Sequence, residues 1–161
     1  MSIVPNSTIK SFNKAVAALW PDGLDQPSLD LMSLVESEVA KYPNSTTLIC
    51  LLADLVSLGG VSRSYGNDPI VIYQRALVID PYCAEAFEGI AYRHYVGDRA
   101  SEAVEYFDMA RNIAERVDTL LGQISSFVEL GQHAEANVAL EDLKALFQRA
   151  MTNAQESLEG Y

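Results

Sequence analysis

The chain has 161 residues, of which 49% are hydrophobic and 20% charged, a composition that excludes intrinsic disorder and suits one domain with a core. Acidic residues outnumber basic ones by 22 to 11. The net charge of −11 disfavours binding to nucleic acid or anionic lipid, because both need a cationic surface. No apolar run approaches the roughly 20 residues of a membrane span. No long apolar run follows Lys10 and Lys14, so no secretory signal is expected, and we predict a cytoplasmic protein.

Apolar residues recur at helical spacing along nearly the whole chain, which predicts an all-α protein. Phe12, Val16 and Trp20 lie on one face of the first predicted helix. Asp68 followed by Pro69 is typical of a helix start, and Gly97 of a helix end. The predicted helices are 8–20, 28–42, 45–58, 69–80, 83–96, 99–115, 117–130 and 132–157.

The second half of the chain repeats itself with a period of 34 residues. Tyr73 aligns with Phe107, Ala76 with Ala110, Phe87 with Leu121, Ile90 with Ile124 and Gly97 with Gly131, without a gap. Each repeat holds two predicted helices, with glycine ending the first. A period of 20–50 residues is typical of solenoids, in which neighbouring repeats bury a common core.

Toward the N-terminus the period becomes 38 residues. Pro43 aligns with Pro81, Leu52 with Ile90 and Gly59 with Gly97. The four extra residues must lie between Gly59 and Tyr73, where the sequence is rich in turn formers. The stretch GGVSRSYG at 59–66 lacks the spacing of a phosphate-binding loop. We interpret it as a loop insertion, and a specific contact is expected at Arg63 and Tyr65.

The chain resembles the tetratricopeptide repeat (TPR) family at these positions. The middle unit carries the family's pattern of large, small, glycine and alanine–aromatic–alanine positions at Phe87, Ile90, Ala91, Gly97, Ala103, Phe107 and Ala110. The last unit departs from the pattern, with Ser125 at the small position and Glu115 where Pro81 would recur. In the N-terminal hairpin, Glu38 stands where an alanine belongs.

The resemblance implies a right-handed superhelix of stacked antiparallel helical hairpins, with about eight helices. It implies a single domain over residues 1–161. Within it, residues 1–42 form a diverged N-terminal hairpin, 45–149 form three TPR-like units, and 150–161 form the end of a capping helix and a tail.

The sequence offers no constellation typical of catalysis. His94 is predicted to lie on the core-facing side of its helix, and His133 is predicted to be exposed. Cys50 and Cys83 lack the paired spacing of a metal site and are predicted to be reduced thiols. We therefore predict no enzymatic activity, no cofactor and no metal site.

The resemblance also implies where a partner would bind. In the TPR family the first helix of each hairpin lines a concave face. The matching positions are Thr47, Cys50, Asp54 and Ser57, then Glu85, Glu88, Tyr92 and Tyr95, and then Thr119, Gly122, Ser126 and Glu129. From these, the predicted partner-binding residues are Asp54, Glu85, Glu88, Tyr92, Tyr95, Ser126 and Glu129, with Arg63 and Tyr65 in the long loop.

This set of residues favours one class of partner. Some family members clamp a peptide's C-terminal carboxylate with cationic side chains, but the matching positions here carry no cation. They are Cys50, Asp54, Gly89, Thr119 and Gln123. Carboxylates beside Tyr92 and Tyr95 favour a segment with apolar anchors and some Lys or Arg. The alternative is that both tyrosines only pack between neighbouring hairpins.

The favoured function is a protein–protein interaction module or adaptor that binds a peptide segment or partner protein in an acidic groove. The alternatives are a structural or oligomerisation subunit of a larger complex, or a small acidic chaperone of the secretion type. A groove-binding module requires a partner segment. An oligomerisation subunit instead associates in a concentration-dependent way without a peptide ligand.

Overall fold

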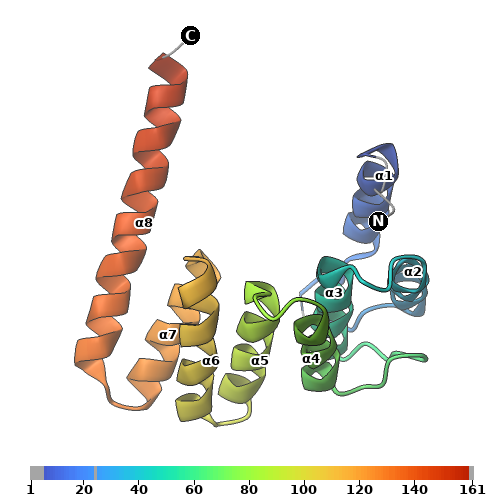
Figure 1. Ribbon diagram of the computed structural model, residues 1–161, viewed down its shortest axis with the longest axis horizontal. Coiled ribbons are helices and arrows are strands. Elements are labelled where there is room, and N and C mark those ends of the chain that lie inside the picture. Colours follow the sequence, from blue (N-terminus) through green and yellow to red (C-terminus); the bar gives the residue numbers. More distant parts are fainter. Residues whose placement is uncertain (1–5, 24, 160–161) are drawn as a thin grey trace. The chain divides into compact units, whose positions relative to one another are not determined.

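The computed structural model describes residues 6–23 and 25–159, and every regular element in this part of the chain is a helix (Figure 1). The helices are α1 Asn6–Leu19, α2 Leu29–Lys41, α3 Thr46–Ser57, α4 Pro69–Ile79, α5 Ala84–Val96, α6 Ala100–Ile113, α7 Val117–Glu129 and α8 His133–Glu159. The predicted helices are confirmed, with ends that differ by at most two residues. None of the described helices is long and apolar enough to cross a membrane.

Local capping signals explain why the helices begin where they do. The side chains of Ser28, Ser45 and Asp68 accept hydrogen bonds from backbone N–H groups in the first turns of α2, α3 and α4. Pro69 occupies the first position of α4, where its missing N–H costs nothing. The predicted start at Asp68–Pro69 is therefore confirmed.

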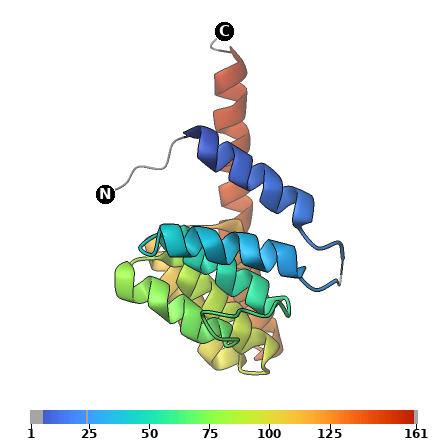
Figure 2. The same cartoon turned by 90° about the vertical axis from the view of Figure 1, so that its right-hand side faces the viewer.

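The chain divides into two compact units between Pro81 and Tyr82, in the connection between α4 and α5. In the N-terminal unit, α1 packs on α2, α2 on α3 and α3 on α4 (Figure 2). Its core includes the fully buried side chains of Leu31, Val35, Leu52 and Ile72. A single domain over residues 1–161 stays a prediction, and each unit is described below by itself.

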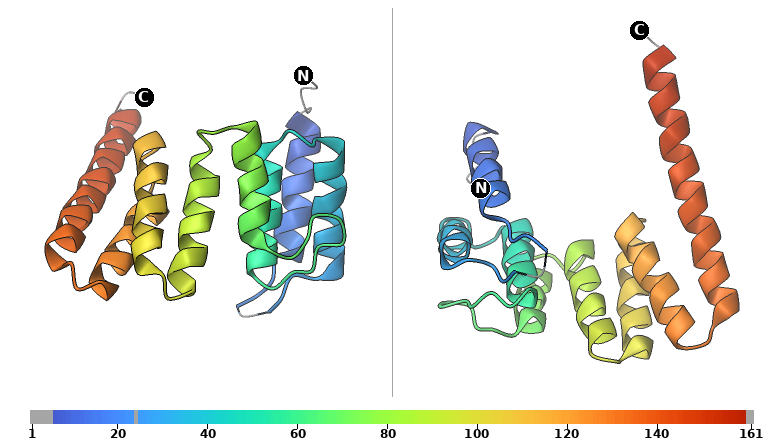
Figure 3. Two further views of the ribbon diagram at one scale, coloured as in Figure 1. Left: turned by 60° about the horizontal axis from the view of Figure 1, so that its bottom comes forward. Right: turned by 180° about the vertical axis from the view of Figure 1, so that it is seen from behind.

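The C-terminal unit consists of the α5–α6 and α7–α8 hairpins, with α6 and α5 both packed on α7 (Figure 3). Phe107 of α6 fills the centre of the unit and is fully buried with Ala91 and Ala103. Ala110 of α6 is fully buried as well, so the alanine–aromatic–alanine pattern of Ala103, Phe107 and Ala110 faces the core. On α8, Ala136, Ala139 and Leu143 form the buried stripe.

The last hairpin does not keep the burial pattern that the 34-residue alignment predicts. The alignment places Leu121 at the position of Phe87, yet Leu121 is 45% exposed. The buried residues Ala103 and Phe107 of α6 correspond to Ala139 and Leu143 of α8, which lie 36 residues later. α7 therefore turns another face toward α6 than the alignment of Leu121 with Phe87 suggests.

Apart from Leu120, the residues that α7 buries are small or polar. Gly122 lies so close to Phe107 that a Cβ atom on it would be 2.1 Å from the ring's Cζ. Thr119, Gln123 and Ser126 are buried around this contact. The fit of Gly122 against Phe107 thus fixes the rotation of α7 about its own axis.

Candidate interaction site

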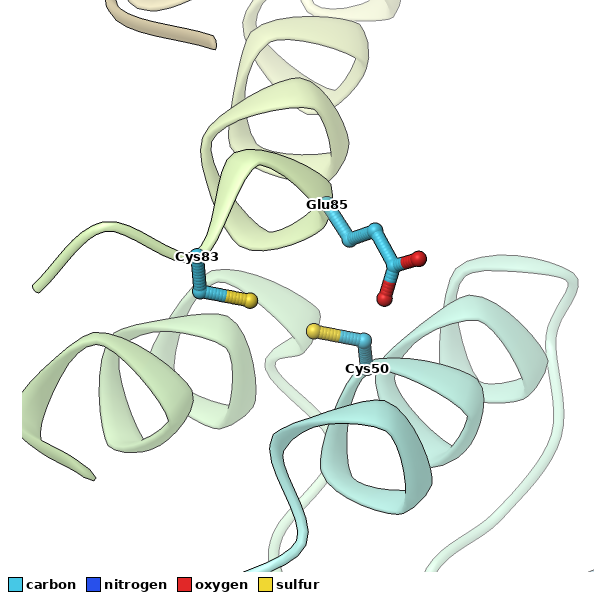
Figure 4. Close-up of side chains that lie close together, drawn as sticks. All are labelled: Cys50, Cys83 and Glu85. Carbon is cyan, nitrogen blue, oxygen red and sulfur yellow. The ribbon is translucent and has the colours of Figure 1, made fainter. Parts of the chain in front are cut away.

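An acidic and aromatic surface lies where α5 meets α7, formed by Glu85, Glu88, Tyr92 and Tyr95 of α5 with Arg116 and Asp118 at the start of α7. We call it the α5–α7 surface. The four α5 residues follow at steps of three, four and three, which places them on one helical face about 15 Å long. Figure 4 shows Cys83 and Glu85 at the N-terminal end of α5.

Arg116 joins the two helices electrostatically. Its Nη1 lies 3.2 Å from Glu85 Oε1, and its Nε lies 3.5 Å from Glu88 Oε2. The Thr119 hydroxyl donates to Glu88 Oε2 at 2.5 Å. The two carboxylates that sequence reasoning assigned to a partner are therefore already engaged within the unit.

These contacts leave the two glutamates in different environments. The side chain of Glu85 is 44% exposed and that of Glu88 only 12%. Burial raises the pKa of Glu88 above its usual range, although Thr119 and Arg116 act in the opposite direction. Burial lowers the pKa of Arg116, and the nearby Glu88 and Glu85 more than offset this, so the net shift is upward. Glu85 is thus the accessible member of the pair and Glu88 the structural one.

Tyr92 connects the same two helices. Its hydroxyl donates to the backbone carbonyl of Asp118 at 2.7 Å, and its ring meets Phe107 edge-on at 5.0 Å between centroids. Burial raises the pKa of Tyr92 to about 12. Tyr95 is half-buried against the Ala91, Ala103 and Phe107 cluster. Packing between hairpins, the alternative raised for these tyrosines, accounts for the contacts of Tyr92.

The α7 positions expected on the concave face are mostly not on a surface. Ser126 is fully buried, and its hydroxyl donates to the Gly122 carbonyl at 2.9 Å. Ser126 is therefore not on the surface of this unit, and its contact with a partner stays a prediction. Glu129, in the last turn of α7, is exposed.

Asp54 belongs to the N-terminal unit, on α3. It accepts a hydrogen bond from the Tyr73 hydroxyl of α4 at 2.5 Å. Burial, followed by the charge of Asp54, raises the pKa of Tyr73. This exposed carboxylate therefore holds the α3–α4 hairpin together, whatever else it contacts.

The long loop before α4 is held in place by a carboxylate of α2. Glu36 Oε1 accepts from the Ser62 hydroxyl at 2.6 Å, from the Arg63 N–H at 2.8 Å and from the Ser64 N–H at 3.3 Å. The side chain of Arg63 is exposed, whereas Tyr65 is half-buried with the Arg75 guanidinium 4.7 Å above its ring. Sequence reasoning identified the loop but missed Glu36, which lies 26 residues before Ser62.

Sequence reasoning also missed a polar network that runs through α6, α7 and α8. Gln123, almost fully buried, donates to Asp108 Oδ1 at 2.5 Å and accepts from Arg111 at 3.4 Å. Arg111 in turn pairs with Asp142 of α8 at 2.5 Å. A buried amide with both ends satisfied specifies how these helices align. The only signal in the sequence was a glutamine on the apolar side of a predicted helix.

The N-terminal unit contains a pocket of about 340 Å³ between α1, α2 and α3. It is lined by Ile9, Phe12, Asn13, Glu38, Tyr42, Ser45, Thr47, Leu48 and Leu51. Glu38, the residue that replaces the expected alanine, pairs with Lys41 at 2.5 Å. No side chain described on α1 is fully buried, so this helix covers the pocket loosely.

Among solved structures, the chain resembles the one titled "MamA MSR-1 C2". The two share 15% identity with a TM-score of 0.59, and the match covers 89% of this chain and 91% of that chain. That protein is a TPR-like helical solenoid, and the likeness shows a TPR-like helical-repeat fold for this chain. No family model and no curated protein matches the sequence.

Proposed function

We propose that this chain is a protein-interaction module that holds a segment of a partner protein on the α5–α7 surface. The observation that carries the proposal is the division of one α5 face into an acidic and an aromatic half. Glu85 is accessible at one end of that face, and Tyr95 is half-buried at the other. The TPR-like fold, whose repeats form extended binding surfaces in general, supports the same conclusion.

The chemistry of this surface selects a partner with a basic residue followed by an apolar one. A Lys or Arg of the partner would replace Arg116 as the ion-pair partner of Glu85. The Arg116–Glu85 pair is weak, because both of its side chains are solvent-exposed. An apolar side chain would pack beside Tyr95 about 15 Å away, a span of four or five extended residues. We propose binding and not catalysis, because Glu88, the largely buried carboxylate here, is engaged by Thr119 and Arg116.

The experiment begins with an affinity capture from the native host, read by mass spectrometry, which names the partner. Synthetic segments of that partner are then titrated by calorimetry against Glu85→Lys and against Glu105→Lys as a matched control. Glu105 is an exposed residue of α6, on the side opposite the buried residues of that helix, so both variants carry the same charge change.

Glu85→Lys removes the ion pair with the partner's cation and adds a repulsion between like charges. We therefore expect it to weaken binding of the segment at least about tenfold, a difference of about 1.4 kcal/mol. Glu105→Lys should bind like the unmodified chain. Equal affinities for the two variants would refute the α5–α7 surface as the binding site. Thermal unfolding of both variants checks that neither change disturbs the fold.

A further inference from the structure

The C-terminal half of α8 extends beyond the helix on which α8 packs. α8 has 27 residues and α7 only 13, or about 40 Å against about 20 Å. Arg149 of α8 pairs with Glu115, and residues 150–158, which follow it, are all exposed. Figures 1 and 3 show the last turns of α8 reaching past the ends of α6 and α7.

This projecting segment carries an apolar stripe, which we define as Phe147, Met151, Ala154 and Leu158. Phe147 is 52% exposed, Met151 70% and Leu158 79%. The steps of four, three and four are the spacing of the a and d positions of a coiled coil. Phe147 follows the buried Leu143 by four residues, so the exposed stripe continues the buried face of α8 into the segment that projects from its unit. Large apolar side chains exposed in one row are typical of an interaction surface.

We infer that the apolar stripe of α8 is a self-association surface, on which α8 of a second copy of this chain packs in the antiparallel direction. A two-fold axis between positions 152 and 153 places Phe147 opposite Leu158 of the other copy, and Met151 opposite Ala154. Each layer thus combines a larger side chain with a smaller one. Such a contact is isologous, since the same surface serves both copies.

The charges of α8 favour a second copy as the occupant. The positions that flank the stripe in a heptad are Gln148, Ala150, Gln155 and Ser157, and all are uncharged. Two copies can therefore approach without like charges facing each other, even though each chain carries a net charge of −11. A strongly basic partner would find no carboxylates beside the stripe.

The same net charge selects the antiparallel direction. In a parallel pair, the parts of both chains that precede α8 would lie at the same end and repel each other. In the antiparallel pair they lie at opposite ends, because residue 146 of one helix is opposite residue 159 of the other. The projecting segment of α8 is thus long enough to pair with the same segment of the second copy.

The contact is small, so the association is weak. Stable interfaces bury about 800 Å² on each partner, more than one face of a 12-residue segment provides. We therefore expect monomer and dimer to be present in equal amounts only at a protein concentration on the order of 100 µM.

Sedimentation equilibrium of the full chain tests the inference. Between about 5 and about 500 µM, the weight-average mass should rise from 17.6 kDa toward twice that value. Met151→Lys should weaken the association at least about tenfold, since a buried Lys would lose its hydration. Thr152→Lys is the control, because Thr152 points away from the stripe. A constant mass of 17.6 kDa, or equal loss in both variants, would overturn the inference.

Disulfide trapping tests the direction of the pair. Met151→Cys and Ala154→Cys are prepared as separate single variants, and each is oxidised alone and in an equal mixture. Cross-linked dimer above the background of the unmodified chain should form mainly in the mixture. Efficient cross-linking of either variant alone would show a parallel pair and overturn the antiparallel arrangement. The stripe shares no residue with the α5–α7 surface, so either proposal can fail alone.

Discussion

Replacing Gly122 by alanine should destabilise the protein, although alanine is the better helix former. The new Cβ would lie 2.1 Å from Cζ and 2.4 Å from Cε1 of Phe107, whose ring is fully buried and cannot move aside. Overpacking of a core costs about 1–3 kcal/mol, and so close a contact belongs at the upper end. The gain in helix propensity from glycine to alanine is about 1 kcal/mol. The net loss is therefore about 2 kcal/mol, or a melting temperature lower by about 4–8 °C.

Urea unfolding followed by circular dichroism measures this loss, and a double-mutant cycle assigns it to the contact. Phe107→Leu alone should also destabilise the core, but in its presence Gly122→Ala should cost much less, because the ring edge is gone. The sign of the single variant is decisive. If Gly122→Ala raises the free energy of unfolding, propensity alone governs this position and the close fit of α7 on α6 is wrong.

Three further changes test the contacts that hold the candidate sites. Glu36→Gln should lower the free energy of unfolding by about 1–2 kcal/mol and speed hydrogen exchange at the Arg63 and Ser64 amides, because the charged acceptor is lost; unchanged exchange would contradict the role of Glu36. Tyr92→Phe should cost about 1 kcal/mol in urea unfolding by leaving the Asp118 carbonyl without its donor, whereas equal stability would show that water replaces the hydroxyl. The raised pKa of Glu88 means that its protonated form favours the folded state, so its contribution to stability falls as pH rises from the ordinary value of 4.5 through the raised one. The stability of Glu88→Gln relative to the unmodified chain should therefore increase over that window, and a constant difference between pH 4 and pH 7 would contradict the assignment.

Most of the fold was predictable because its signals are local. Helix starts depend on a capping side chain within three residues, as at Ser28 and Asp68, and helix faces depend on spacing within one turn or two. The rotation of α7 was not predictable in this way. It depends on how Gly122 meets Phe107, which comes from a different repeat, and a sequence alignment of Leu121 with Phe87 carries no information on that contact.

The sequence predicted which α5 residues lie together in the candidate site, but it did not predict the contacts that these residues make with α7. Glu85, Glu88 and Tyr92 do lie on one face of α5, as helical spacing requires. Their partners, Arg116 and the Asp118 carbonyl, lie about 30 residues further along the chain, and only the packing of α7 brings them near. For the same reason Glu36 could not be connected with the loop that it holds.

Because Glu85 already forms an ion pair with Arg116, its negative charge adds little to the free energy of binding a cationic partner. A cation from a partner gains one exposed ion pair with Glu85 and displaces another, that of Arg116, and each is worth only about 0–1 kcal/mol. The difference between two such pairs is too small to hold a complex. Charge at this surface therefore governs the rate and the selectivity of association, whereas the affinity has to come from an apolar anchor beside Tyr95. A partner segment with basic residues alone should bind weakly and lose that binding in salt. A segment with an apolar residue four or five positions after the basic one should bind more tightly and keep its binding in salt.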